Sequence, residues 1–303
     1  MQCEYGTPSF RSVVLATSLP GRVKSCQILK IHFCVRCHKV PAMGKLLAID
    51  GLNIVRRVYE ANVEPDTSAK ADAALRHSLA SFRKLLTTHQ PTHVLPAFDF
   101  GGHTWRHDLY ARYRENREPM PEVLKQRLPD FYLQLAALGL KMVEVPEVEA
   151  DDVIATGVMR WLAEGRGEAI VASTDKDLHV LIAHGAVVWD HFKSEWHDSK
   201  WVEEKFGVPP EKLTDLLALM GDVSDSIPGV SKVGVKTAAK LLQSYGTIER
   251  IMAGAGILKD GLGERLRKDA VQLELSRKLV ELKTDVRMGV TWNMLAFDAA
   301  HIG

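Results

Sequence analysis

Short apolar runs, typical of buried strands, alternate from residue 44 onward with longer stretches whose apolar residues recur at helical spacing. The strand-like runs are Lys45–Asp50, His93–Asp99, Leu140–Val145, Ala169–Thr174 and Ala186–Asp190. The helical stretches between them are Ala69–Thr88, Pro121–Leu138 and Ala150–Glu164. This alternation predicts an α/β fold in which helices cover both faces of a largely parallel sheet.

The pattern changes after Lys200, where helical stretches follow one another across turns that contain glycine or proline. These stretches are Trp201–Phe206, Glu211–Met220, Val235–Tyr245 and Gly263–Leu282. We therefore expect two domains, an α/β domain over residues 44–199 and a smaller all-helical domain over residues 200–303.

The segment 1–43 has no sustained period and holds every cysteine of the chain, at positions 3, 26, 34 and 37. We interpret it as a disordered extension or an upstream reading artefact, with Met43 as the start. The alternative is a targeting peptide, because the segment is basic and poor in acids. Cys34 and Cys37 have the spacing of a metal or haem motif, but no second pair follows at zinc-finger spacing. The cysteine-free body predicts a reducing, cytoplasmic location.

The formal net charge of +1, from 39 basic and 38 acidic residues, hides an uneven distribution. The first 43 residues carry six basic side chains and one acidic side chain, which leaves 33 basic and 37 acidic in the body. Nine of those acids are clustered, so the remainder is mildly basic, as suits a partner with a phosphate backbone. No run approaches the roughly 20 apolar residues that span a bilayer, so we expect no membrane-spanning role.

The nine clustered carboxylates lie at the ends of predicted strands, in the first turn of a predicted helix, or in a loop of the helical region. They are Asp50, Asp99, Glu149, Asp151, Asp152, Asp175, Asp177, Asp222 and Asp225. Ligands of parallel sheets bind beyond the carboxyl ends of the strands, which is where several of these acids converge. Carboxylates a few ångströms apart raise each other's pKa unless a cation neutralises them, and oxygen ligands favour Mg²⁺ or Mn²⁺. The pattern predicts a two-metal phosphoryl-transfer site.

Each acidic group also has a purely structural interpretation. Asp50 and Asp99 could be turn or cap residues, and the acids from Glu149 to Asp152 could cap a helix. Strand alternation predicts that Asp175 and Asp177 point to one side while Lys176 faces away, although the stretch could be a solvated loop. Asp222 and Asp225 could belong to an Asx turn. Four such groups in one chain favour the metal site.

The stretch from Ile227 to Lys240 has the layout of a helix-hairpin-helix, with Gly229 and Gly234 five residues apart. Free N–H groups at the start of the second helix, with three lysines nearby, predict contacts to the phosphates of duplex DNA without sequence preference. These lysines are Lys232, Lys236 and Lys240. The alternative is an ordinary helix cap with surface lysines.

Between Asp99 and Pro121, aromatic residues alternate with arginines, from Trp105 and Arg106 to Tyr113 and Arg114. Arginine binds phosphates and tyrosine stacks on bases, so we expect this stretch to contact a single strand. The alternative is a solvent-facing amphipathic helix. His103 and His107 are more typical of surface residues than of metal ligands.

Over residues 44–245 these motifs resemble the bacterial 5′ nucleases: the exonuclease domain of DNA polymerase I, the phage 5′ exonucleases and the standalone exonuclease IX group. The matching motifs are LLAIDGLN at 46, AFD at 97, YRENREPMP at 113, VEADDVI at 148, STDKDL at 173 and LMGDVSDSIPGVSKVGVKTA at 219. The stretches 104–107 and 189–196 resemble the standalone group in particular.

The resemblance implies a PIN-like nuclease domain with a helical arch at about residues 100–125, and a helix-three-turn-helix domain over 200–303. The implied substrate is DNA with a 5′ flap or a single-strand/duplex junction, cut by a monomer with two Mg²⁺, for which Mn²⁺ can substitute. The first metal would be held by Asp50, Asp99, Glu149, Asp151 and Asp152, and the second by Asp175, Asp177, Asp222 and Asp225.

The resemblance also implies a K⁺ that bridges to a DNA phosphate, and a set of DNA contacts. The K⁺ would lie on main-chain oxygens of Leu219, Met220, Pro228, Val230 and Val233. The expected DNA contacts are Arg106, Lys232, Val233, Gly234, Val235, Lys236, Thr237 and Lys240. In the arch, Arg114 and Arg117 would offset charge on the scissile phosphate and Tyr113 would stack on a base.

The chain departs from the family pattern at two places. Exonuclease IX lacks the acids that match Asp222 and Asp225, and Arg114 stands where the family usually has lysine. Two alternatives remain open. An RNA-cutting PIN-domain nuclease would lack the hairpin from Gly229 to Gly234, and a DNA-binding protein that has lost catalysis would lack some of the acids.

Overall fold

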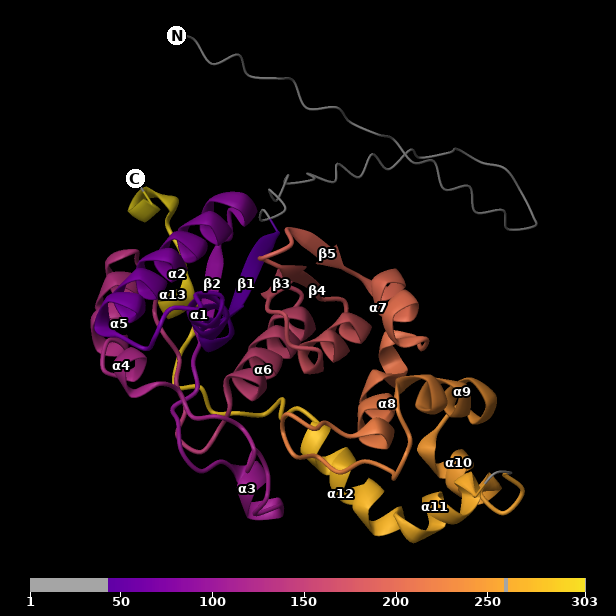
Figure 1. Cartoon of the computed structure of the whole chain (residues 1–303). Helices are drawn as coiled ribbons and strands as arrows, with labels where there is room; N and C mark the ends of the chain where they lie inside the picture. The colour runs from indigo at the N-terminus through magenta and orange to yellow at the C-terminus, as the bar shows by residue number, and fades with distance from the viewer. Residues whose placement is uncertain (1–42, 259–260, 303) are drawn as a thin grey trace, which may run out of the picture. The chain divides into compact units, whose positions relative to one another are not determined.

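A computed structural model describes residues 43–258 and 261–302 of the chain. The predictions for residues 1–42, including the cysteine pair, lie outside the described residues. The described part contains one five-stranded sheet with helices between its strands, and further helices follow the last strand in the sequence (Figure 1). No helix in this part is long and apolar enough to cross a membrane.

The sheet has the strand order β2-β1-β3-β4-β5. Its first four strands pair in parallel and confirm the predicted α/β class. They are β1 (Gly44–Asp50), β2 (His93–Ala97), β3 (Gly167–Ala172) and β4 (Val187–Asp190). The sequence pattern missed β5 (Glu195–His197), an antiparallel edge strand of three residues, because so short a polar segment has no apolar run.

The prediction of a strand over Leu140–Val145 is wrong. Only one parallel bridge forms there, in which Phe98 N donates to Val143 O (3.0 Å) and Val143 N donates to Pro96 O (2.9 Å). The next bond of a parallel ladder would need an N–H donated by Pro96, and proline has none. The pairing therefore stops after a single bridge.

Helices cover both faces of the sheet, as predicted. Alternate residues of β1 point to opposite faces, so Leu46 and Ala48 join one apolar cluster while Leu47 and Ile49 join the other. The first cluster includes the buried side of α6 (Ala150–Ala163). The second includes α1 (Gly51–Glu60) and α2 (Ser68–His89).

Two predicted helices are each divided in the structure. Pro121–Leu138 contains α4 (Glu122–Lys125) and α5 (Leu128–Ala137), and α5 begins at Leu128-Pro129 because proline fits only the first turn of a helix. Gly263–Leu282 contains α11 (Leu262–Lys268) and α12 (Ala270–Val280). The break lies at Asp269, whose carboxylate accepts a hydrogen bond from Ser231 N at 2.8 Å.

The other helices of the second half are short, and one of them, Leu213–Met220, packs against η2, α9 and α12. They are α7 (Ser199–Phe206), η2 (Pro210–Lys212), α8 (Leu213–Met220), α9 (Val235–Tyr245) and α10 (Ile248–Gly254). The chain then returns to the sheet, where α13 (Trp292–Leu295) contacts β2 and η3 (Ala299–Ile302) contacts α2. The last segment therefore packs on the α/β domain although it follows the helical one in sequence.

Candidate active site

Four of the predicted acids meet at the carboxyl edge of the sheet. Asp50 ends β1, Asp99 follows β2, Asp151 lies in the first turn of α6, and Asp175 follows β3. Burial, with the charges of Asp99 and Asp175, raises the pKa of Asp50 to about 7. Burial and the same neighbours, with Asp50, raise the pKa of Asp151 well above its usual value. We call Asp50, Asp99, Asp151 and Asp175 the edge group.

Hydrogen bonds hold two members of the edge group, Asp50 and Asp99, in place. Asp50 caps α1 by accepting from Asn53 N (3.1 Å), and its other oxygen accepts from Ser173 Oγ (3.0 Å). Asp99 accepts from Ala150 N at 2.7 Å, a donor at the start of α6 that has no partner within the helix. Asp50 and Asp99 therefore cap or anchor local structure while their charges still act on the rest of the group, so the structural and the functional interpretations are compatible.

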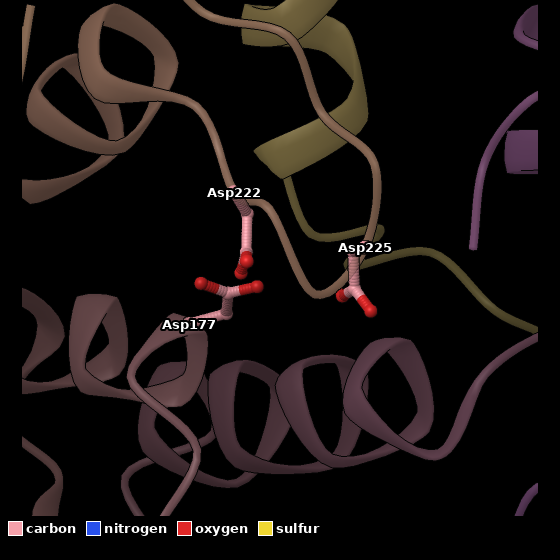
Figure 2. Close-up of side chains that lie close together, drawn as sticks. All are labelled: Asp177, Asp222 and Asp225. Atoms are coloured by element: carbon pink, nitrogen blue, oxygen red, sulfur yellow. The ribbon is translucent and has the colours of Figure 1, made fainter. Parts of the chain in front are cut away.

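A second group brings together Asp177, Asp222 and Asp225, which we call the loop group (Figure 2). One oxygen of each lies within 4.8 Å of the others. Burial, followed by the charge of Asp175, raises the pKa of Asp177 to about 8. Its Oδ1 is buried and has no hydrogen-bond partner among the described residues. Three converging carboxylates with one unsatisfied oxygen are a donor set that fits a hard divalent cation.

Two glycines shape the loop that presents Asp222 and Asp225. Asp222 and Ile227 exchange backbone hydrogen bonds of 2.8 and 2.7 Å, which closes the loop. Gly221 and Gly229 lie back to back with positive φ of 68° and 61°. A Cβ on Gly229 would lie 2.4 Å from Gly221 N, so no larger residue fits this crossing.

Lys176 donates to Asp222, and the prediction that it faces away from the acids is wrong. The backbone of Lys176 is helical, with φ of −67° and ψ of −28°, and η1 (Asp177–His184) begins at the next residue. Strand alternation therefore does not apply to this stretch. Burial raises the pKa of Asp222, but hydrogen bonds from Lys176 and Ser224 outweigh it and lower that pKa overall.

Arg114 and Arg117 reach the acids from the predicted arch. Arg114 Nη2 lies 3.1 Å from Glu149 Oε2, and its Nε lies 3.2 Å from Asp225 Oδ1. Arg117 Nη1 is 3.8 Å from the same Asp225 oxygen. Arg114 N also donates to Asp225 O at 2.9 Å, with Arg114 at a φ of 57°. The arch is thus tied to an acid of each domain.

Asp152 accepts four hydrogen bonds, two on each of its oxygens. Arg106 donates to it twice (2.8 and 3.0 Å), Trp105 Nε1 at 2.8 Å and Lys283 N at 2.9 Å. Its side chain is 0% exposed. Glu149 also has both oxygens engaged: it accepts from Thr104 and Tyr113, and its Oε2 lies 3.2 Å from Arg106 Nη1 and 3.1 Å from Arg114 Nη2. Both acids therefore hold residues of the predicted arch, and the charge of Glu149 also raises the pKa of Asp151 in the edge group.

Two residues of the arch do not occupy the positions expected for DNA contacts. Arg106 is buried, with 3% exposure, and its Nε donates to Leu279 O at 2.8 Å, so it is not a surface cation. Tyr113 is also 3% exposed and donates to Glu149, so its ring has no open face for a base. Alternation of arginines and aromatics cannot tell surface cations from those that pair with buried acids. Residues 100–125, the predicted arch, contain two short helices, α3 (Trp105–Leu109) and α4.

The predicted hairpin presents its lysines to solvent. Lys232, Lys236 and Lys240 are exposed, and Gly234 precedes α9 with nothing within 4 Å of a Cβ built on it. Among the predicted K⁺ ligands, the oxygen of Leu219 accepts from Val230 N (2.8 Å) and that of Val230 accepts from Val233 N (3.0 Å). The sequence interpretation assigned no role to Asn53, Ser173 and Thr104. The available signal was that Asn53 and Ser173 lie within acidic motifs and Thr104 within the stretch 104–107.

Comparison with known proteins defines the class. The model of the 5′-3′ exonuclease N-terminal resolvase-like domain matches residues 45–207, and that of the 5′-3′ exonuclease C-terminal SAM fold matches residues 208–302. The chain therefore belongs to the 5′-3′ exonuclease family, and it is a metal-dependent nuclease.

Within this family the chain is similar to proteins named flap endonuclease Xni. It is 38% identical over 244 residues to that of Shewanella amazonensis, which covers 80% of this chain and 94% of the relative. The protein of Psychromonas ingrahamii is 35% identical over 249 residues, with coverage of 82% and 95%.

The fold is similar to that of T5 5′-exonuclease with bound divalent zinc ions, with a TM-score of 0.65, 20% identity, and 79% and 90% of the two chains covered. The catalytic core of Rad2 with DNA substrate gives a TM-score of 0.51, 14% identity, and 80% coverage of both chains. At sequence identities of 20% and 14%, these two similarities show a shared fold and nothing more.

Proposed function

We propose that this protein is a structure-specific 5′ nuclease that hydrolyses DNA phosphodiesters near a 5′ flap or a junction of single strand and duplex. The same site would also remove nucleotides from 5′ ends. The observation that carries the proposal is that hydrogen bonds link the edge group to the loop group through Asp175. Its N donates to Ser173 Oγ, which donates to Asp50, and its Oδ1 accepts from Asp177 N. The relatives named flap endonuclease Xni support the flap as substrate.

We assign two Mg²⁺ sites, with Mn²⁺ as a substitute. The edge group and Glu149 would hold one ion, and the loop group the other, with Asp175 between them. Asp152 would hold Arg106 and would not bind metal. When bound, such ions supply a water of lowered pKa and neutralise charge on the leaving oxygen. K⁺ on the carbonyls of the loop from Leu219 to Val233 remains part of the proposal.

The chain's own residues position the substrate. Arg114 and Arg117 carry fixed positive charge at the acids, where a scissile phosphate would arrive, and so they would offset its charge. Lys232 precedes α9, and Lys236 and Lys240 lie one turn apart within it. All three are exposed and would bind the phosphates of the adjoining duplex. All these groups come from one chain, so we propose that it acts as a monomer.

Cleavage of a labelled 5′-flap DNA with Mg²⁺ and with EDTA tests the proposal. We expect cuts near the junction with Mg²⁺ and none with EDTA. A matched RNA flap and a blunt duplex serve as controls. Preferential cleavage of RNA would favour the PIN-type ribonuclease, and flap binding without any cleavage would favour a DNA-binding protein of low activity.

Lys236→Ala should weaken duplex binding to a similar extent for unrelated sequences. Lys236 faces solvent in the first turn of α9, so it would meet backbone phosphates and not base edges. The slope of log affinity against log salt should fall by about one contact. Fluorescence anisotropy over a salt series measures this, with Lys205→Ala on α7 as the control. A changed sequence preference with an unchanged slope would contradict the assignment.

The metal-free protein should lose stability as the pH rises from 6.5 to 8. In this window the folded state still binds protons on Asp177 and Asp50, with pKa values of about 8 and 7, whereas the unfolded carboxylates, at 3.8, have lost theirs. Below 6.5 buried histidines oppose the trend, because burial lowers the pKa of His89 and of His179 to about 4.

Melting temperatures in EDTA at pH 6.5 and pH 8 check this trend. Mg²⁺ should raise the melting temperature more at the higher pH, because bound cations favour the ionised carboxylates. Asp177→Asn removes one of the groups responsible and should reduce the decline. A melting temperature that is constant or rises over this range would show that the carboxylates are not held protonated.

A further inference from the structure

Behind the loop group lies a buried pair of histidines that the proposed chemistry does not use. His179 lies in η1, two residues after Asp177, and His197 ends the edge strand β5. Their exposed fractions are 2% and 3%. His179 Nδ1 is 2.9 Å from Asp175 O, and its Nε2 is 2.8 Å from His197 Nδ1. The pair thus connects the outer edge of the sheet to the backbone between two acids of the site.

The hydrogen bond to Asp175 O defines which nitrogen of His179 is a donor. A carbonyl oxygen only accepts, so His179 Nδ1 must donate to Asp175 O. This donation holds whether or not the ring carries a second proton on Nε2, the atom that lies 2.8 Å from His197 Nδ1. The contact between the two rings therefore supports a donor whose direction follows from the geometry alone.

Aromatic stacking fixes the two rings. The His197 ring stacks on Trp201 of α7 with centroids 3.6 Å apart and planes inclined by 13°. The His179 ring lies 4.9 Å from the same indole at 18°. Because Trp201 holds both rings, the direction of the bond to Asp175 O is set by α7 and β5, outside the acidic site.

We propose that His179 and His197, held by Trp201, are positioning residues that fix the backbone between Asp175 and Asp177 and thereby set the affinity of the adjoining site for divalent metal. This inference rests on the metal ligands assigned above. Asp175 Oδ1 accepts from Asp177 N at 3.0 Å, so a shift of the Asp175 carbonyl would move both carboxylates. Hydrogen bonds that orient metal ligands from outside typically change metal affinity by roughly 10–100-fold when removed.

Two substitutions of His179 separate positioning from packing. His179→Phe keeps a ring against Trp201 but loses the donor to Asp175 O. His179→Asn loses the ring, but its amide nitrogen stands near the position of Nδ1 and can still donate. If His179 only fills space, the asparagine variant should lose more stability and more metal affinity than the phenylalanine variant. If His179 positions the backbone, the phenylalanine variant should lose more metal affinity. His89→Phe is the matched control, since His89 is a buried histidine whose ring meets Trp189 and Trp196 edge to face and makes no hydrogen bond or ion pair with the acids in the described part of the chain.

The measurements are Mn²⁺ binding by calorimetry without DNA, and single-turnover flap cleavage over a range of Mg²⁺. We expect His179→Phe to weaken Mn²⁺ binding by about tenfold. Its cleavage should reach half of the maximal rate only at a correspondingly higher Mg²⁺ concentration. Its affinity for the flap DNA, measured in Ca²⁺, should be unchanged. His179→Asn and His89→Phe should bind Mn²⁺ nearly as the parent does, even where they melt earlier. Parent-like Mn²⁺ binding by His179→Phe, or equal loss in both His179 variants, would overturn the inference. A parent protein that binds no Mn²⁺ would instead overturn the assigned metal sites as well.

Discussion

Asp222→Asn combined with Asp225→Asn should reduce flap cleavage by more than about a hundredfold. Removing a residue that only hydrogen-bonds to a metal ligand already lowers metal affinity or activity by roughly 10–100-fold, and these two acids would be ligands themselves. The two acids supply most of the loop group, and only Asp177 would remain. DNA binding in the absence of metal should be kept or improved, because repulsion of the phosphates falls. Excess Mn²⁺ should restore part of the rate by mass action. Single-turnover cleavage at saturating Mg²⁺, with a melting curve, measures both effects.

A matched control removes two negative charges elsewhere. Glu203→Gln with Glu204→Gln makes the same change of charge on the exposed side of α7 and should leave the rate near that of the parent. The loop itself should survive in the test variant, since asparagine can still accept from Ser224 N, which now bonds Asp222 at 2.8 Å. An unchanged rate in a folded double variant would mean that the edge group suffices with one metal.

Arg114→Ala should slow cleavage at saturating metal by about 10²–10³-fold, the usual effect of removing one group that meets charge developing in a transition state. Flap affinity should fall much less, because such a contact is stronger in the transition state than in the bound substrate. Arg114→Lys should restore much of the rate, since lysine keeps the charge but not the planar fork. Arg112→Ala is the control, because Arg112 is exposed and pairs only with Glu115 among the described residues.

The contacts of Arg114 allow a second role that the same experiment separates. Arg114 bridges Glu149 and Asp225, so it also neutralises acids that would hold metal. If that were its whole function, Arg114→Ala would bind Mg²⁺ more tightly and cut at the rate of the parent once metal is saturating. A lower rate at saturation assigns it to the substrate.

The sequence determined the class of fold and most of the site. Apolar runs located the four parallel strands, and the acids at their ends identified an edge where Asp50, Asp99 and Asp175 meet. This was predictable because the carboxyl ends of parallel strands must lie at one edge. Asp177, Asp222 and Asp225 also belonged to the predicted set of metal ligands, whereas the crossing of Gly221 and Gly229 that presents two of them is a finding of the structure.

Only the tertiary structure decided which charged residues pair with each other. Arg106 and Tyr113 looked like surface contacts for DNA, yet both are buried against Glu149 and its neighbours. Lys176 turns toward Asp222 because η1 begins beside it, which no alternation of residues reveals. The histidine pair depends on β5, an edge strand too short to leave a pattern. Local periodicity records which side of an element is buried, whereas ion pairs between distant segments depend on how the elements pack, so they appear only in the folded chain.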